Sequence, residues 1–592
     1  MRGARTMSMQ KPKRKKMRLL SFAQPKVENP GKQSEILTSL LPLAKKKSIV
    51  AFVFAVIFLS GCRISSESLE KASTEEKPAL TQELFAKGQA LYEKQCSVCH
   101  GAFGAADGKA AYLLYPKPRN FAVDKFRLVS TNNMEATDED LYKVITGGMA
   151  GSAMPPWDHL AGKDRWALVY YVRYLSELEN YKQSGEGTDE MIAKGLPWEL
   201  KEKMTRKIIS PENLIQVPPE PEVTEDALAR GKELFLSSCA GCHGKLGKGD
   251  SQQEMKDNLG YPLRARDLTA GIFKGSSSSK DLYCRMVGGI PGTPMPSYTG
   301  VFTQEQIWDL IHYSQSLSNK DAEERVRLRA QKLIVAKTTG ALDADPSSPI
   351  WQSAKSASIA LTPLWWRDDY IKEVEVKALY NKDKIAFHLS WSDATLNDAN
   401  VAIQSFSDGA ALQFSVEKDP PFFGMGDNQA AVYLWHWKAA WQDADGRKDI
   451  ETQYPNAAVD WYSAQKDYRH GDSFEVSQSK TKFHDPAFVT GWGAGNPLSN
   501  PENSSAAEEA ISKGFSSLTT QMPKMEKIDA KGVWQDGRWQ VVFIRSLNAQ
   551  EKDALTFLSG KSLSIAFALW DGNGKDRNGQ KMVSIWNTLI LR

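Results

Sequence analysis

Cysteine is scarce in this sequence, with only 6 in 592 residues. That number is too small for a disulfide framework, so the chain must be stabilised by buried apolar cores, and its length predicts several of them. Long apolar runs are also rare. The most apolar run, residues 49–59, is too short to cross a bilayer. The sequence also offers no acid–base pair, nucleophile motif or open metal site, so we predict no catalytic residue.

A large surplus of charge of one sign is missing as well. The whole chain has a net charge of +4, but residues 1–61 hold 13 Lys and Arg against 2 Glu, a net of +11. Since +4 less +11 leaves −7, residues 62–592 are mildly acidic. The charge therefore gives no reason to expect nucleic-acid binding.

The N-terminal segment is similar to the signal of a bacterial lipoprotein. Basic residues 45–47 precede the apolar run, which is followed by Gly61 and Cys62. The sequence LSGC resembles a lipobox, which implies cleavage before Cys62 and lipidation of its sulfur. An uncleaved N-terminal anchor is the alternative. Both hypotheses place the remaining chain at the periplasmic or extracytoplasmic face of a membrane.

Two C-x-x-C-H motifs are what the sequence does contain, QCSVCH at residues 95–100 and SCAGCH at residues 238–243. Thiols at i and i+3 lie on one helical turn and can both bond a haem, while the adjacent His faces its iron. A thioredoxin-like dithiol does not explain the repeated His, and a zinc site needs four ligands. The predicted haem c attachment residues are Cys96, Cys99, Cys239 and Cys242, and the predicted axial histidines are His100 and His243.

A methionine in a Gly- and Pro-rich loop follows each motif. Met154 comes after the first motif and Met295, at nearly the same separation, after the second. A thioether ligand raises the potential of haem iron and completes its coordination, so electron transfer is expected and substrate binding is not. The alternative ligands are Met149 and Met286.

The sequences around the motifs are copies of one pattern, and they resemble class I cytochrome c domains. DLYKVITGGMAGSAMPPW in the first copy matches DLYCRMVGGIPGTPMPSY in the second. We therefore expect two all-α cytochrome c domains and two haem c groups. Tyr115, Arg119, Tyr261 and Arg264 are candidates for contacts with haem propionates.

The last third of the sequence alternates apolar and polar residues, as in VEVKALYNKDKIAFHLSWSD and GVWQDGRWQVVFIR. This period, broken by polar turns, predicts hairpins and a mostly β sandwich or barrel. The predicted divisions are a signal at 1–61, a tether at 62–83, cytochrome domains at 84–182 and 227–320, a linker at 183–226, a linker helix at 321–344 and the β domain at 345–592.

Several blocks of the β domain, among them FSDGAALQFSVEKDPPFFGMGD and IAFALWDGNGKDRNGQKMVSIWNTL, resemble the haem-binding γ subunit of ethylbenzene dehydrogenase and its relatives, including nitrite oxidoreductase. The resemblance implies one haem b held between a Met and a Lys. Met425 is the expected Met, and Lys513 is the first choice of Lys. Lys531 and Lys581 remain open, and His436 is a further candidate.

Together these features predict a multihaem electron-transfer subunit. By resemblance its partners are the iron–sulfur and molybdopterin subunits of an oxidoreductase on one side, and a soluble cytochrome or respiratory oxidase on the other. One alternative is a dihaem cytochrome c whose β domain is a haem-free module that binds a ligand or partner. Another is a small-molecule oxidase with a five-coordinate haem b.

Overall fold

A computed structural model describes residues 76–399, 402–422, 424–427, 429–442, 505–521, 528–548 and 555–592. All of them belong to one compact unit of the chain. The predicted signal and Cys62 lie outside these residues. Within the described ranges, no helix is both long enough and apolar enough to cross a membrane.

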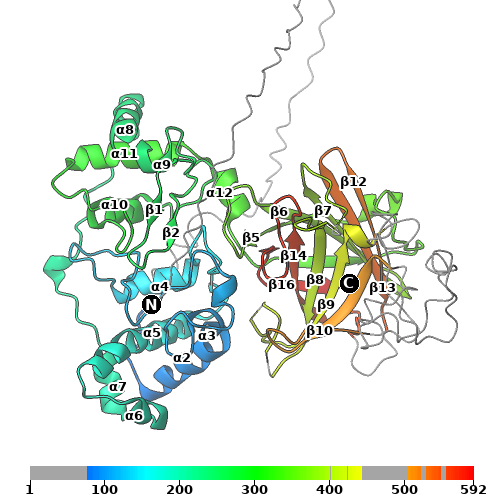
Figure 1. The fold of residues 1–592 in the computed structure, drawn as a ribbon, viewed down its shortest axis with the longest axis horizontal. Helices are drawn as coiled ribbons and strands as arrows, with labels where there is room; N and C mark the ends of the chain where they lie inside the picture. Colours follow the sequence, from blue (N-terminus) through cyan, green and yellow to red (C-terminus); the bar gives the residue numbers. More distant parts are fainter. Residues whose placement is uncertain are drawn as a thin grey trace, which may run out of the picture. The chain divides into compact units, whose positions relative to one another are not determined.

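The first helical domain surrounds the first cysteine motif (Figure 1). Its helices are α2 (Gln82–Gln95), α3 (Ser97–His100), α4 (Asp138–Gly147) and α5 (Gly162–Gln183). The Thr81 hydroxyl caps α2 by accepting a hydrogen bond from the Leu84 amide, and Thr137 and Asp140 form a capping box at the start of α4. These caps fix where each helix begins and therefore how it approaches the motif.

A second helical domain repeats this order with α8 (Glu225–Ser238), α9 (Ala240–His243), α10 (Ser279–Gly288) and α11 (Gln304–Ser316). In both copies the first and last helices touch at a glycine. A Cβ on Gly88 would lie 2.1 Å from the carbonyl oxygen of Ala167, and one on Gly231 would lie 2.1 Å from that of Asp309. Only glycine permits this approach of two helix backbones.

The segment between the two domains contains α6 (Asp189–Lys194) and α7 (Trp198–Thr205). Leu196 and Trp198 pack against the core of the first domain, beside Phe85. This part of the predicted linker is therefore an extension of the first core.

The predicted linker helix at 321–344 is wrong in its second half. Helix α12 (Lys320–Val326) ends after two turns, and β3 (Lys332–Lys337) follows in an extended conformation. The sequence KLIVAK is rich in β-branched residues, which favour a strand once a neighbouring strand is present. Strand β3 pairs in parallel with both β16 (Asn587–Leu591) and β6 (Glu373–Tyr380), so it belongs to the sheet.

The C-terminal third is a folded-over β sheet, which confirms the predicted mostly β domain (Figure 1). Its order is β11-β10-β9-β8-β14-β16-β3-β6-β7-β13-β12. The remaining strands are β4 (Ala357–Ala360), β5 (Thr362–Pro363), β7 (Lys384–Ser392), β8 (Gly409–Ser415), β9 (Val432–Lys438), β10 (Ala507–Ser512), β11 (Thr519–Thr520), β12 (Asp529–Gln535), β13 (Arg538–Ser546), β14 (Ser562–Trp570) and β15 (Met582–Val583). The two hairpins expected from sequence are the pairs β6–β7 and β12–β13.

Aromatic side chains fill the space between the two halves of this sheet. Phe387 on β7 lies 5.8 Å, centroid to centroid, from Phe414 on β8 and from Trp435 on β9. Trp391 and Trp539 are almost fully buried in the same core. Truncating one such side chain to alanine costs about 3–5 kcal/mol.

Candidate haem-binding sites

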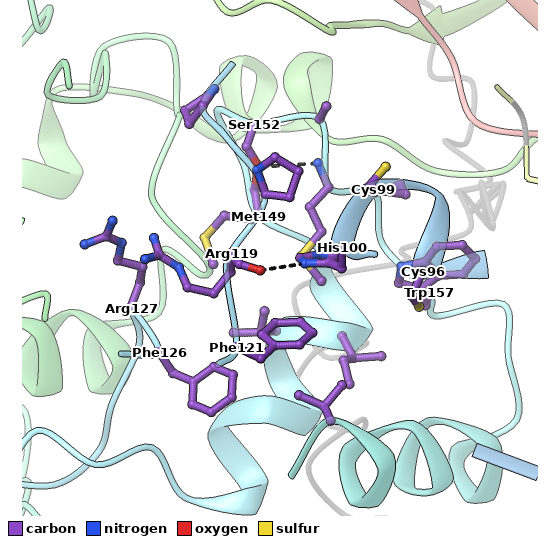
Figure 2. Close-up of a pocket in the computed structure, with 18 of the residues that line it drawn as sticks. Cys96, Cys99, His100, Arg119, Phe121, Phe126, Arg127, Met149, Ser152 and Trp157 are labelled. Carbon is purple, nitrogen blue, oxygen red and sulfur yellow. Dashed lines mark hydrogen bonds between the residues drawn. The ribbon is translucent and has the colours of Figure 1, made fainter. Parts of the chain in front are cut away.

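The first cysteine motif occupies a single turn at the end of α2. The amide of Cys99 donates to the carbonyl of Cys96 at 3.1 Å, and the amide of His100 donates to the same oxygen at 2.9 Å. This turn directs the two thiols and the imidazole into one cavity (Figure 2). Aromatic and aliphatic residues line most of it, including Tyr92, Leu114, Phe121, Phe126, Leu141, Val144, Ile145, Trp157, Leu168 and Val172.

His100 is oriented by the backbone. Its Nδ1 lies 3.0 Å from the carbonyl oxygen of Arg119, the contact drawn as a dashed line in Figure 2. When Nδ1 carries the proton and donates it to this carbonyl, Nε2 is left with a lone pair for a metal. Burial lowers the pKa of His100, which also favours the neutral ring. Phe121 stacks on the imidazole with the ring centroids 4.7 Å apart.

Both candidate methionines of the first domain line this cavity. The Met149 amide donates to the Met154 carbonyl at 3.1 Å, so the two residues lie at the two ends of one tight loop. Ser152 supports the loop, because its hydroxyl accepts a hydrogen bond from the Met154 amide at 3.3 Å. The backbone therefore presents two thioethers to the site.

The second motif has the same local geometry. The amides of Cys242 and His243 donate to the carbonyl of Cys239 at 3.1 and 2.9 Å. Burial lowers the pKa of His243, whose Nδ1 lies near the backbone of Arg266 without completing a hydrogen bond. The Met295 carbonyl accepts from the Ile290 amide at 3.2 Å, which matches the Met154–Met149 contact of the first copy.

Arg119, a candidate from the sequence, lines the first cavity, but the sequence analysis missed the other cationic side chains there. Arg127, Arg266 and Lys274 line it together with Arg119, and Arg266 and Lys274 come from the second helical domain. Arg127 is paired with Asp257 at 3.0 Å. Burial, added to the charge of neighbouring arginines, places the pKa of Lys274 well below its usual range. An apolar cavity that also offers guanidinium and amine hydrogen-bond donors suits a flat ligand that carries carboxylates.

Met425 lies in the left-handed region of the backbone, at φ 84°, between β8 and β9. Its side chain packs against the cluster of Val432, Leu434 and Ala510, as does Trp586. Its carbonyl accepts hydrogen bonds from the Gly514 amide at 2.9 Å and from the Ser512 hydroxyl at 2.7 Å. The predicted Met and the segment that carries Lys513 are therefore neighbours.

The three candidate lysines differ in their surroundings. Lys513 and Lys531 are exposed. Lys581 is half-buried, with its Nζ 4.8 Å from the ring centroid of Trp570, and burial lowers its pKa to about 8. An amine must lose its proton to bind iron, and the lowered pKa of Lys581 favours this loss. Lys513, in contrast, belongs to the segment that lies next to Met425.

His436 is engaged elsewhere. Its Nδ1 lies 2.8 Å from Glu508 Oε1, and Glu508 also accepts a hydrogen bond from the Thr520 hydroxyl. This pairing explains the position of His436 as a packed, partly buried residue.

The Met425 loop and the first cysteine motif share contacts. Phe422 lines the first cavity, with its ring 6.5 Å from that of Trp157. A Cβ added to Gly424 would lie 3.4 Å from Phe515. Phe515, Leu364 and Cys99 each pack against the same small apolar cluster, Ala110, Leu114 and Ala153.

Leu364 extends this contact to Lys581, because its amide donates to the Lys581 carbonyl at 3.0 Å. The backbone of Lys581 is therefore next to that of Leu364, while its side chain extends to the ring of Trp570.

Comparison with family models divides the chain into three parts. Residues 348–582 match the model described as ethylbenzene dehydrogenase. Residues 83–172 match cytochrome c oxidase, cbb3-type, subunit III, and residues 228–318 match cytochrome c.

Each of the following relatives matches less than half of the chain. A protein of Haloferax mediterranei named as a respiratory nitrate reductase haem subunit, ORF7, is 23% identical over 41% of this chain and 66% of its own length. The chlorate reductase γ subunit of Ideonella dechloratans is 23% identical over 43% of this chain and 83% of its own. The cbb3-type oxidase subunit CcoP of Azospirillum is 26% identical over 27% of this chain and 55% of its own. The match thus spans about half of the CcoP protein.

Proposed function

Because the chain joins two cytochrome c domains to a domain of the ethylbenzene dehydrogenase family, we propose that it is a multihaem electron-transfer subunit of a molybdenum- and iron–sulfur-containing oxidoreductase. It passes electrons between that enzyme and a soluble cytochrome or oxidase of the respiratory chain. A nitrite oxidoreductase-like enzyme belongs to this class of partner. The chain works at the extracytoplasmic face of a membrane, where lipid on Cys62 holds it.

The cavity around the first cysteine motif is the main observation that supports this proposal. Cys96 and Cys99 would hold a haem c covalently, and His100, through Nε2, and Met154 would be the protein ligands of its iron. Arg127, Arg266 and Lys274 line the same cavity and would lie near the haem propionates. Cys239, Cys242, His243 and Met295 hold a second haem c in the same way. With both axial positions taken by protein, such a centre supplies one-electron transfer and has no place for substrate.

The Met425 loop supports a third centre. We assign Met425 as one axial ligand of a haem b and Lys581 as the other, in place of Lys513. Lys581 is half-buried and lies beside the aromatic ring of Trp570. Its low proton affinity suits an amine ligand, whereas Lys513 is exposed to water.

The contacts of Phe422 and Phe515 support an order of transfer. Both aromatic residues are close to the Met425 loop, and both reach the surroundings of the first motif. The first cytochrome c domain is therefore the immediate partner of the haem b, and the second cytochrome c domain follows it. The catalytic partner then docks on the β domain.

Purification from the native host tests the assignment to a complex. We expect a tag at the C-terminus of this chain to retain a molybdenum-containing protein and an iron–sulfur protein, with molybdenum close to one per chain. A purified chain free of both metals, from membranes solubilised gently and with its haems intact, would contradict the assignment.

A further inference from the structure

Three buried aspartates meet at one end of the β sandwich, where Asp571 follows Trp570, the residue beside Lys581. Asp393 directly follows β7, Asp408 directly precedes β8, and Asp571 directly follows β14. Each offers a carboxylate oxygen, and these oxygens lie within 4.8 Å of one another. The exposed fractions of Asp393, Asp408 and Asp571 are only 7%, 0% and 8%.

The sheet explains why these side chains come together. Trp570 is paired with Gly409 across β14 and β8, so Asp571 and Asp408 lie side by side at the end of one half of the sheet. Strand β7 belongs to the other half, where it pairs with β13. The indole N–H of Trp539 on β13 donates to Asp408 Oδ2 at 3.0 Å and so connects the two halves at this point.

Positive charge does not balance the cluster. Arg367 binds Asp571 at 3.1 Å and also pairs with Asp576. Among the residues that the structure describes, neither Asp393 nor Asp408 has an ion pair. Four carboxyl groups therefore face one guanidinium, in a place where an unpaired charge is costly.

One oxygen of the cluster has no partner. Asp393 Oδ1 accepts from the amide of Thr395 at 3.1 Å, but Oδ2 is buried and has no hydrogen bond within the described part of the chain. The indole N–H of the neighbouring Trp391 lies close enough to interact with this carboxyl group but completes no hydrogen bond within the described residues. Buried carboxylate oxygens are almost always satisfied in a native protein, so this one indicates a missing ligand.

We propose that Asp393, Asp408 and Asp571 bind a hard divalent cation of the Ca²⁺ type, which joins the two halves of the sandwich. Only oxygen atoms are offered, which selects Ca²⁺ or Mg²⁺ over the transition metals. Ca²⁺ accepts irregular sets of oxygen ligands at about 2.3–2.6 Å and tolerates carboxylates from distant strands. The inference does not depend on the haem content of the chain.

A shared proton is the competing explanation. Burial, with the charge of Asp393 beside it, raises the pKa of Asp408 to about 7, so a carboxyl–carboxylate hydrogen bond would also relieve the repulsion. The two explanations differ in their response to metal, because only the first requires a cation for stability.

Calorimetric unfolding of the full holoprotein separates them. After treatment with a chelator, the transition of the β domain should shift to lower temperature, and added Ca²⁺ should restore it. Metal analysis of untreated protein should find one calcium per chain. In Asp393→Asn and Asp408→Asn the transition should no longer respond to Ca²⁺.

Asp536→Asn is the matched control. Asp536 is exposed in the β12–β13 turn, next to Gly537, whose carbonyl accepts a hydrogen bond from the Asp393 amide. The Asp536→Asn substitution removes one carboxylate charge at the same end of the sandwich but outside the cluster. The unfolding transition of this variant should therefore respond to Ca²⁺ as that of the unmodified protein does. A transition that ignores chelator and Ca²⁺ would overturn the proposal, as would an undiminished Ca²⁺ response in both cluster variants. Because removal of a buried charge favours folding without metal, both variants should fold.

Discussion

At the scale of single residues, the backbone decides how the ligand side chains are presented. Arg119 orients His100 through its carbonyl, and the contact between Met149 and Met154 closes the loop that faces the imidazole. Both contacts use a backbone carbonyl oxygen as the acceptor, so they do not depend on the side chains of Arg119 or Met154. Both thioethers line the cavity, so the loop alone does not decide whether Met149 or Met154 binds the iron. Substitution of each residue tests which one does.

Substitution of each methionine should therefore give different spectra. We expect Met154→Ala to open the sixth position of one haem c, so that half of the reduced c-type haem binds carbon monoxide and its potential falls. Met149→Ala should leave carbon monoxide binding at the background level. The reverse pattern would identify Met149 as the ligand.

The ligands of the haem b are tested in the same way. We expect Met425→Ala and Lys581→Met to remove or shift the b-type absorption while both c-type bands stay unchanged. Lys513→Met is the control and should keep the b-type spectrum, since Lys513 is exposed. Loss of the b-type band in Lys513→Met alone would return the assignment to that residue.

At the scale of elements, the contact between first and last helices sets the shape of each cytochrome domain. Helix α2 meets α5 at Gly88, and α8 meets α11 at Gly231. The cysteine motif begins at the end of the first helix in each copy, so the contact also positions the motif.

A methyl group at this contact should disrupt the first domain. In an ordinary helix Gly→Ala stabilises by about 0.5–1 kcal/mol, but at Gly88 the added carbon meets a backbone carbonyl that cannot move aside. We expect Gly88→Ala to lower the free energy of unfolding by about 1–3 kcal/mol and to reduce incorporation of the first haem c. Ala86→Ser on the exposed face of α2 should do neither, and equal stabilities for the two variants would contradict the packing argument.

Local signals in the sequence were sufficient for most elements. The motifs, the glycine-flanked methionine loops and the alternation in 374–393 depend on residues close together in the chain, so their structures follow from spacing alone. Strand β3 was mispredicted because its conformation depends on β16, which comes more than 250 residues later in the chain.

Long-range contacts escaped prediction for the same reason. Arg266 and Lys274 of the second domain contribute to the first cavity, and Asp393, Asp408 and Asp571 meet only after the sheet has folded over. Lys581 was one of three open candidates. The burial that lowers its pKa arises only in the folded chain, so the residues next to it in the sequence do not reveal it.

At the scale of the whole molecule, the chain combines a predicted export signal, two predicted haem c domains and a predicted haem b domain. The predicted lipid site precedes the first domain by about 20 residues, so the anchor and the electron path are separate. We expect Cys62→Ala to release the mature protein from membranes or to block its processing, as fractionation and mass spectrometry of the N-terminus would reveal. Normal maturation and membrane retention of this variant would refute the lipobox assignment.

The haem content of the purified chain tests the central claim most directly. Pyridine haemochrome spectra, calibrated against the protein concentration, should give two c-type haems and one b-type haem per chain after expression with the cytochrome c maturation machinery. Two c-type haems without haem b would contradict the electron path described here and favour a haem-free binding module at the C-terminus.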